Sequence, residues 1–234
     1  MQHQIPLGFH FNDELTLDSY IAGPNTEAVD TLRQLPEHPV EPFIYLWGNA
    51  QTGKSHLLQA LSLAFARKNM AIALIALRDH DQYPPQILEG LEQLSLVCID
   101  DIDCIAGIDN QPAWEESLFH FFNCMRERGT PLLVSASSPP AQLNLQLEDL
   151  KSRLGWGLTF QLRPISDEQK IEVLQKRAQL RGMELSDEVG RYLLSRFSRD
   201  MGDLMSLLNS LDKASLAEQR RLTIPFVKQA IKSN

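Results

Sequence analysis

The sequence has no apolar run that approaches the roughly 20 residues a helix needs to cross a membrane. Near the N-terminus, Asn12, Asp13 and Glu14 interrupt any apolar core of a secretory signal before it can form. Both absences favour a cytoplasmic protein without a membrane partner.

Cysteine is scarce as well. The three cysteines, Cys98, Cys104 and Cys124, have no metal-ligand spacing, and Cys98 lies in an apolar run that is typical of a protein core. We expect reduced, structural thiols. The scattered histidines complete no Ser/His/Asp or Cys/His set, so the sequence gives no support to nucleophilic catalysis of that kind.

Positive charge is in deficit and is not clustered. The chain has 22 Lys and Arg against 30 Asp and Glu, which gives a formal net charge of −8. Proteins that bind DNA through many phosphates need clustered basic side chains. The sequence therefore predicts no strong direct DNA binding, although a local basic patch is compatible with a negative total.

The clearest motif that the sequence contains is at residues 48–55, which fit the phosphate-binding loop G-x-x-x-x-G-K-[ST]. Its glycines allow close backbone approaches, and the N–H groups of the loop and of the next helix would point at phosphate oxygens. Lys54 would reach the β- and γ-phosphates, and the Ser55 hydroxyl would bind Mg²⁺. For His56 a packing role is an equal alternative. The predicted nucleotide-binding residues of this stretch are Asn49, Ala50, Gln51, Thr52, Gly53, Lys54, Ser55 and His56.

The flanking residues have the order that such a loop needs. An apolar run at 43–47 predicts a buried strand, and apolar residues from Leu57 to Phe65 recur at helical spacing. Strand, loop and helix in this order favour a phosphate-binding loop over a glycine-rich turn that binds nothing.

A further apolar run ends in two acids, Asp100 and Asp101. Taken alone, such a run indicates only a strand exit. However, the run follows the phosphate-binding loop at a distance that fits one intervening βα unit, which favours a functional role. Asp100 would then hold Mg²⁺ through water and Asp101 would orient the attacking water. Ser135 or Ser137, at the end of a later apolar run, would then lie beside the γ-phosphate.

The apolar runs predict an α/β domain followed by a helical one. Runs at 43–47, 71–77, 94–101, 130–138 and 158–162 predict five strands, with helical patterns between them that include an aromatic core-facing helix at 113–128. After Pro164 only helical patterns follow, at about 167–181, 186–197, 200–217 and 223–232. We expect a tail at 1–12, a nucleotide-binding domain at 13–164 and a small all-α domain at 165–234.

The tail contains an amide, a proline and two large apolar side chains in a short pattern. Such a peptide would dock into an apolar cleft of a partner, with the proline lowering the ordering cost, or would pack on its own domain. The residues alone favour neither alternative. The pattern comprises Gln4, Ile5, Pro6, Leu7, Gly8 and Phe9.

The order of phosphate-binding loop, Asp-Asp strand, polar strand end and four-helix lid resembles an AAA+ module. Residues 15–25, 48–58 and 150–158 resemble DnaA, the bacterial replication initiator, and the resemblance covers about 13–233. It implies a five-stranded parallel sheet with helices on both faces, followed by the lid. It also implies bound ADP or ATP with Mg²⁺, a purine nucleotide whose base is partly enclosed by Tyr20 and Ile21.

Compared with DnaA, the chain lacks two parts and has one additional peptide. In this combination it resembles the Hda type of DnaA-related regulator. The DNA-binding domain that follows the AAA+ module of DnaA is missing, and a short tail stands in place of its N-terminal domain. The tail pattern resembles the peptide by which replication proteins bind the DNA sliding clamp, and residues 94–100 and 222–228 also resemble this type. The implied partners are DnaA and the clamp, with self-association as a dimer as a further hypothesis.

The resemblance assigns to Arg153 the role of an arginine finger that acts in trans on ATP-bound DnaA. The alternative is a surface salt bridge. Hydrolysis to ADP would leave an initiator that cannot start replication again. The chain would then be a negative regulator of replication initiation.

One departure from the family concerns the lid. Its third helix usually carries an arginine that contacts the nucleotide, and the corresponding residue here is Gly202. Arg199, three residues earlier, would lie on the same helical face and would compensate. We expect weak or no ATP hydrolysis by the chain itself and a preference for a diphosphate.

Two other functions stay open. A helicase loader that acts with single-stranded DNA would need a basic groove, which the acidic balance disfavours. A small P-loop kinase would need substrate-binding arginines and a mobile lid inserted into the α/β domain.

Overall fold

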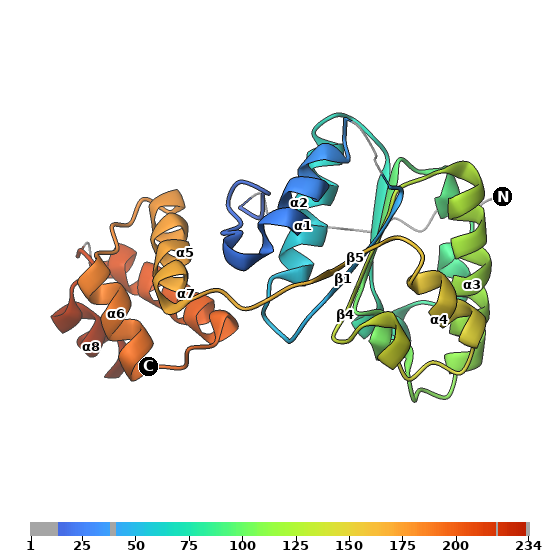
Figure 1. The fold of residues 1–234 in the computed structure, drawn as a ribbon. Coiled ribbons are helices and arrows are strands. Elements are labelled where there is room, and N and C mark those ends of the chain that lie inside the picture. Colours follow the sequence, from blue (N-terminus) through green and yellow to red (C-terminus); the bar gives the residue numbers. More distant parts are fainter. Residues whose placement is uncertain (1–13, 38–40, 219, 233–234) are drawn as a thin grey trace. The chain divides into compact units, whose positions relative to one another are not determined.

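The computed structural model describes residues 14–37, 41–218 and 220–232 (Figure 1). The peptide predicted to bind the clamp, Gln4–Phe9, lies outside these residues. By their contacts, the described residues form two compact units. One contains 14–17 and Pro24–Arg163, and the other contains Asp18–Gly23 and 164–232. The segment Asp18–Gly23, which the sequence analysis placed with the α/β domain, thus groups with the helical unit.

Five parallel strands form the centre of the first unit (Figure 1). Their order in the sheet is β2-β3-β4-β1-β5. All neighbouring pairs are parallel, which confirms the predicted parallel sheet. The strands are β1 (Phe43–Trp47), β2 (Ile72–Ala76), β3 (Leu96–Asp100), β4 (Leu132–Ala136) and β5 (Leu158–Gln161).

The register aligns the C-terminal ends of the strands. Trp47 at the end of β1 pairs with Ala136 at the end of β4, and Ala76 at the end of β2 pairs with Asp100 at the end of β3. In open α/β sheets ligands bind outside this edge, because the loops that leave the strands meet there. The segments that follow β1, β2, β3 and β4 are therefore brought together.

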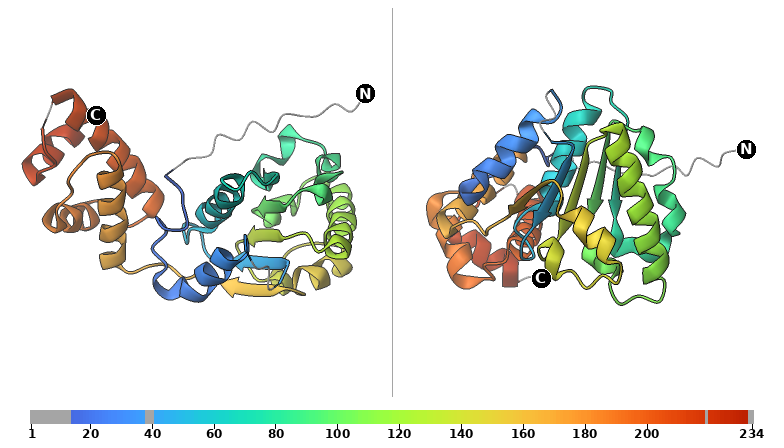
Figure 2. Two further views of the ribbon diagram at one scale, coloured as in Figure 1. Left: turned by 90° about the horizontal axis from the view of Figure 1, so that it is seen from above. Right: turned by 45° about the vertical axis from the view of Figure 1, so that its right-hand side comes forward.

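Helices cover both faces of the sheet, as expected (Figures 1 and 2). On one face lie α1 (Thr26–Gln34) and α2 (Lys54–Ala66), and on the other lie α3 (Gln111–Arg128) and α4 (Glu148–Leu154). Trp114 and Phe122 of α3 are buried against the sheet in one cluster with Tyr45. The aromatic stripe of α3 is therefore core, as its spacing predicts.

Short 3-10 turns connect several of these elements. They are η1 (Gly23–Asn25), η2 (Leu77–Gln82), η3 (Pro85–Leu88), η4 (Leu91–Gln93), η5 (Ile102–Ile105) and η6 (Pro140–Gln142). The first residues of η2 directly follow β2, which places them at the ligand-binding edge of the sheet.

Four helices form the second unit, which confirms the predicted all-α lid. They are α5 (Asp167–Leu180), α6 (Asp187–Arg196), α7 (Met201–Glu218) and α8 (Ile224–Lys232). Leu174, Leu193, Leu208 and Phe226 come from the four helices and are fully buried in one apolar cluster. The unit thus has its own core.

No helix in the described parts of the chain has the length and apolar character needed to span a bilayer.

Candidate functional site

The phosphate-binding loop connects β1 to α2 at the C-terminal edge of the sheet. The N–H of Gly48 donates to the carbonyl oxygen of Ala136 at 3.3 Å. A Cβ at Gly48 would come within 2.4 Å of the carbonyl oxygen of Leu162, so no side chain fits there. Gly53 has a φ of 89°, a left-handed conformation in which L side chains are strained. The backbone therefore requires both glycines of the motif.

The Lys54 side chain lies across the inside of this loop. Its Nζ donates to the carbonyl oxygens of Gly48 at 2.8 Å and Asn49 at 3.1 Å. Thr52 Oγ1 also donates to the Asn49 carbonyl, at 3.0 Å. These bonds hold a buried cation at the start of α2, where N–H groups and the helix dipole already favour an anion.

Two carboxylates, Asp100 and Asp101, follow one another at the end of β3. Ser135 Oγ donates to Asp100 Oδ1 and accepts from the Asp101 N–H at 2.9 Å. Burial, and then the neighbouring Asp100, raise the pKa of Asp101, although Arg78 opposes the shift. Ser135 is fully buried, so in this structure it braces the two acids.

These elements line a pocket of about 550 Å³. Asn49, Thr52, Asp100 and Ser135 do not line it, although the first two belong to the loop. His56 does, and its Nε2 also lies 3.1 Å from the Thr16 carbonyl oxygen. The roles of all these residues in nucleotide binding stay predictions. The lining residues are Ala50, Gln51, Gly53, Lys54, Ser55, His56, Arg78, Asp101 and Ser137.

The oxygen atoms of Ser55 and Asp100 suit Mg²⁺, which prefers oxygen ligands and keeps water and phosphate oxygens in the rest of its shell. Arg78 Nη2 lies 3.3 Å from Ser55 Oγ and 3.4 Å from Asp100 Oδ2, so both oxygens face one cationic atom. In the described part of the chain, no group of three or more His, Cys, Asp or Glu side chains could hold a metal ion. An ion here would therefore depend on phosphate oxygens.

The remaining predicted nucleotide ligands belong to the helical unit. Tyr20 and Ile21 lie within Asp18–Gly23, and Arg199 and Gly202 lie at the start of α7. Their part in nucleotide binding stays a prediction.

Arg199 does not share a helical face with Gly202, contrary to the prediction. Helix α7 begins at Met201, so Arg199 precedes it. Asp200 Oδ1 accepts from the Asp203 N–H at 3.1 Å and caps the first turn, which ends the helix before Arg199. Arg199 instead lies 3.2 Å from a carboxylate oxygen of Asp167.

Arg153 of α4 lies near the N-terminal ends of the strands, at the edge of the sheet opposite to the phosphate-binding loop. It lines a second pocket, of about 490 Å³, together with Glu41, Phe43, Thr130 and Leu132. These four residues mark the N-terminal ends of β1 and β4, whereas the phosphate-binding loop follows the C-terminal end of β1. The five residues of β1 separate the two edges by about 17 Å at the usual rise of a strand.

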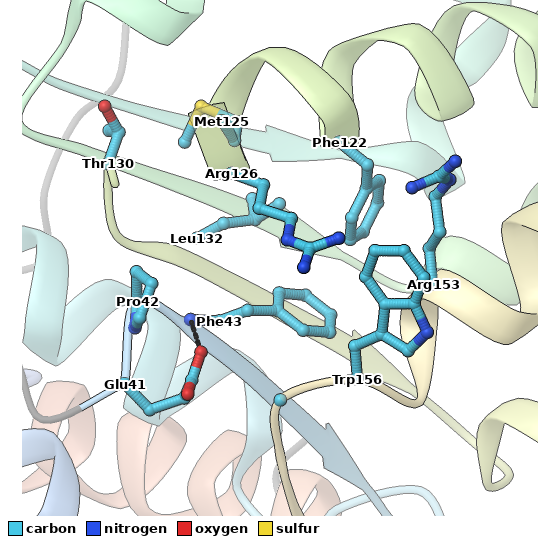
Figure 3. A pocket seen from close by; sticks show the side chains of 11 residues that line it. Glu41, Pro42, Phe43, Phe122, Met125, Arg126, Thr130, Leu132, Arg153 and Trp156 are labelled. Carbon is cyan, nitrogen blue, oxygen red and sulfur yellow. Dashed lines mark hydrogen bonds between the residues drawn. The ribbon is translucent and has the colours of Figure 1, made fainter. Parts of the chain in front are cut away.

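Aromatic rings hold the Arg153 guanidinium. Its Cζ lies 4.5 Å from the ring centroid of Phe119 and 4.7 Å from that of Trp156. Arg126 lies 4.3 Å from the same Trp156 ring, and Figure 3 shows both arginines converging on this tryptophan from α3 and α4. Among the described residues, Arg153 Nε has no hydrogen-bond partner and no carboxylate pairs with the guanidinium. The rings therefore position the guanidinium without cancelling its charge.

A buried carboxylate fixes the segment that leads into α4. Glu115 is 2% exposed, and its Oε1 accepts from Gln111 Nε2 at 2.6 Å. The N–H of Gln146 donates to Oε1 at 2.9 Å, and the N–H of Leu147 donates to Oε2 at 2.6 Å. Leu147 is the N-cap of α4, so Glu115 helps to set where the helix carrying Arg153 begins.

Sequence reasoning missed Arg78, Trp156 and Glu115 as site residues. The one signal for Arg78 is its position directly after a predicted strand, at the edge where ligands bind. Trp156 and Glu115 carried no such signal, because their contacts depend on how α3 packs beside α4.

Two family profiles match consecutive parts of this chain. The profile of the bacterial DnaA ATPase domain matches residues 11–161, and the profile described as "Hda, lid domain" matches residues 167–231.

Solved structures of DnaA share the fold. Domain III of the Thermotoga maritima replication initiation protein DnaA has a TM-score of 0.80 at 18% identity, over 96% of this chain and 98% of that one. DnaA from Aquifex aeolicus bound to AMPPCP has a TM-score of 0.70 at 20% identity, over 86% and 67%. DnaA bound to AMPPCP and single-stranded DNA has a TM-score of 0.70 at 19% identity, over 86% and 65%.

At these identities the solved structures show the fold, and the profiles show the family. The DnaA profile covers more than half of the chain, and the lid profile covers the four helices that follow it. The chain therefore belongs to the DnaA-related AAA+ family and is of the Hda type.

Proposed function

We propose that this DnaA-related replication regulator is a negative regulator of replication initiation that acts on DnaA. It holds a purine nucleotide, docks on the DNA-loaded sliding clamp and inserts Arg153 into the nucleotide site of ATP-bound DnaA. The observation that carries this proposal is the position of Arg153, at the edge of the sheet opposite to the chain's own phosphate-binding loop.

The chemistry of Arg153 is that of a cation supplied in trans. Charge develops on the γ-phosphate during hydrolysis, and a guanidinium from a neighbouring molecule stabilises it, which is worth about 10³–10⁵ in rate where measured in GTPases. Phe119 and Trp156 hold this guanidinium without neutralising it. DnaA left with ADP would no longer start replication.

The chain's own pocket is proposed to hold ADP in preference to ATP. Lys54 and Ser55 would contact the phosphates, and Asp100 would join Ser55 in holding Mg²⁺, whose charge neutralises phosphate oxygens when it is bound. Asp101 would orient a water molecule. Because Gly202 supplies no lid arginine to a γ-phosphate, the chain itself is expected to hydrolyse ATP weakly or not at all.

Docking on the sliding clamp is proposed for the peptide Gln4–Phe9. Its support is the resemblance of this pattern to clamp-binding peptides, together with the membership of the chain in a replication family. If the same peptide packs between two copies of the chain, self-association as a dimer would hide it from the clamp.

A second candidate function is that of a helicase-loader-like protein that acts with single-stranded DNA. One observation favours it, namely that a DnaA of the same fold was solved with single-stranded DNA bound. The net charge of −8 argues against it. Fluorescence anisotropy with a labelled single strand tests this candidate directly.

The primary test measures ATP hydrolysis by purified ATP-bound DnaA in the presence of DNA-loaded clamp. Adding the wild-type chain should accelerate hydrolysis by at least about 10³-fold, and Arg153→Ala should remove nearly all of that effect. Arg67→Ala removes an exposed arginine at the far end of α2 and should stimulate like the wild type.

Two results would contradict the proposal. If wild type and Arg153→Ala stimulate equally, Arg153 is not the finger. If neither stimulates, the chain does not act on DnaA hydrolysis, and single-strand binding becomes the leading function.

A further inference from the structure

Arg78 lies at the ligand-binding edge because of the strand order. It is the second residue after β2, and the parallel pairing of Ala76 with Asp100 places the ends of β2 and β3 side by side. The residue that follows β2 by two positions is thereby brought next to the acids that end β3. Arg78 thus enters the nucleotide pocket from a strand that contributes nothing to the phosphate-binding motif.

A single nitrogen atom of Arg78 contacts three functional groups. Its Nη2 lies 3.3 Å from Ser55 Oγ and 3.4 Å from Asp100 Oδ2, and it also bonds to Asp101 Oδ2. The Arg78 side chain is 53% exposed, whereas the two carboxylates are 7% and 20% exposed. A partly exposed guanidinium therefore offsets part of the negative charge of two largely buried acids.

Two of these three groups, Ser55 and Asp100, are the ones predicted to hold a metal ion. A Mg²⁺ ion at this site would bind the Ser55 oxygen directly, at about 2.0–2.1 Å in octahedral geometry, and would bind Asp100 through one of its water molecules. The Arg78 nitrogen lies within 3.4 Å of the same two oxygens, so it occupies the space that the ion and its water molecule would take. The ion and the guanidinium both supply positive charge at the same corner of the pocket.

We propose that Arg78 is a built-in counter-cation of the nucleotide site, which competes with Mg²⁺ for Ser55 and Asp100. It allows the pocket to hold a nucleoside diphosphate without a divalent metal. This inference rests on the nucleotide site of the proposed function. It goes beyond that function by naming Arg78 as the cation that takes the place of Mg²⁺ in the site.

The chemistry of arginine fits this role. A guanidinium stays protonated at any physiological pH, and it carries five N–H donors in a fork that matches phosphate oxygens. The three contacts above use one terminal nitrogen. Together with Lys54 it offsets the charges of Asp100 and Asp101, so a diphosphate that enters the pocket without a metal ion does not meet a net negative charge.

The first experiment measures the affinity of the full chain for a fluorescent ADP analogue, in Mg²⁺ and in EDTA. For the wild type we expect a difference of less than about threefold between the two conditions. For Arg78→Gln we expect the affinity for the ADP analogue in EDTA to fall by about tenfold or more, because one charge-assisted hydrogen bond is lost. Mg²⁺ should restore most of this affinity. Arg78→Lys keeps the charge and should lie between the two.

The second experiment uses no nucleotide. Binding of Mn²⁺ to the nucleotide-free chain, followed by the electron paramagnetic resonance of the free ion, should be at least about fivefold tighter in Arg78→Gln than in the wild type, because a like charge is removed from the ion's site. Adding Asp100→Asn to Arg78→Gln should remove the gain. Arg67→Gln, about 20 Å away along α2, is the matched control and should bind Mn²⁺ like the wild type.

The inference is overturned if wild type and Arg78→Gln bind Mn²⁺ equally and show the same dependence of ADP affinity on Mg²⁺. It is also overturned if ADP binding by the wild type is lost in EDTA. Because neither readout involves DnaA, these outcomes are independent of whether Arg153 acts in trans. Thermal unfolding of each variant shows that a changed affinity does not come from a misfolded chain.

Discussion

Arg78 and Arg153 lie at opposite edges of one sheet and are held by opposite kinds of partner. Carboxylates surround Arg78, which fixes its guanidinium and cancels its charge locally. Aromatic rings surround Arg153, which positions the guanidinium and leaves its charge uncancelled. The first arrangement suits a cation that serves the chain's own pocket, and the second suits a cation that is offered to another molecule.

Trp156 is expected to position Arg153, since its ring is half exposed and contacts both Arg153 and Arg126. In Trp156→Ala the guanidinium loses a cation–π partner, and stimulation of DnaA hydrolysis should fall by roughly three- to thirtyfold. Trp156→Phe keeps a ring and should retain more of the stimulation. The measurement is the hydrolysis rate as a function of the concentration of the variant.

A positioning role predicts that the maximal rate falls more than the half-saturating concentration rises. A change in the half-saturating concentration alone would mean that Trp156 only contributes contact area to DnaA. Full stimulation by Trp156→Ala would show that Phe119 and α4 suffice to position Arg153.

At the scale of elements, helix α4 depends on a carboxylate from α3. The helix is only seven residues long, which is too short to be stable from its own hydrogen bonds. Glu115 accepts hydrogen bonds from the N–H groups of Gln146 and Leu147, at the start of α4. A buried carboxylate that accepts three hydrogen bonds from these N–H groups ties the start of α4 to α3.

Glu115→Gln should therefore lower the free energy of unfolding by about 1–3 kcal/mol, because an amide NH₂ would face N–H donors in a buried site. Urea unfolding followed by circular dichroism measures the change. The matched control is Glu116→Gln on the same helix, whose side chain is 76% exposed and should change the free energy by less than about 0.5 kcal/mol. Equal effects of the two substitutions would refute a supporting role for Glu115.

Element positions were largely predictable because periodicity and capping are local. The strand predicted to end in the acids is β3, and its last residue is Asp100. The start of α7 shows the limit of this reasoning. Both Ser198 and Asp200 are residues that cap helices, and only the structure shows that Asp200 caps the helix. Because Asp200 is the cap, the helix begins at Met201 and Arg199 is not on the helical face on which it was expected.

At the scale of the whole molecule, the proposed function depends on how the chain would be delivered to DnaA. A clamp-binding tail would raise the local concentration of Arg153 near DnaA on newly copied DNA. Tethering of this kind can raise apparent affinity by about 10²–10⁴-fold without a new contact at the catalytic site.

Deletion of residues 1–12 should therefore reduce the stimulation of DnaA hydrolysis by at least about tenfold when DNA-loaded clamp is present. The affinity for the ADP analogue should stay unchanged, because the pocket lies in residues 50–137. The substitutions Gln4→Ala, Leu7→Ala and Phe9→Ala together should mimic the deletion. Sedimentation velocity of both forms reports whether the tail also mediates self-association. Full stimulation by the truncated chain would contradict docking through the tail.

The sequence by itself determined the phosphate-binding loop, the acidic strand end, the two kinds of domain and the family, because each depends on residues close together in the chain. The tertiary structure alone decided what surrounds the two arginines. Arg78 meets Ser55 and Asp101 only because β2 and β3 are neighbours in the sheet, and Arg153 rests on Phe119 only because α3 packs beside α4. Strand order and helix packing join residues that are 23 to 34 positions apart, and the local patterns of a sequence do not encode such contacts.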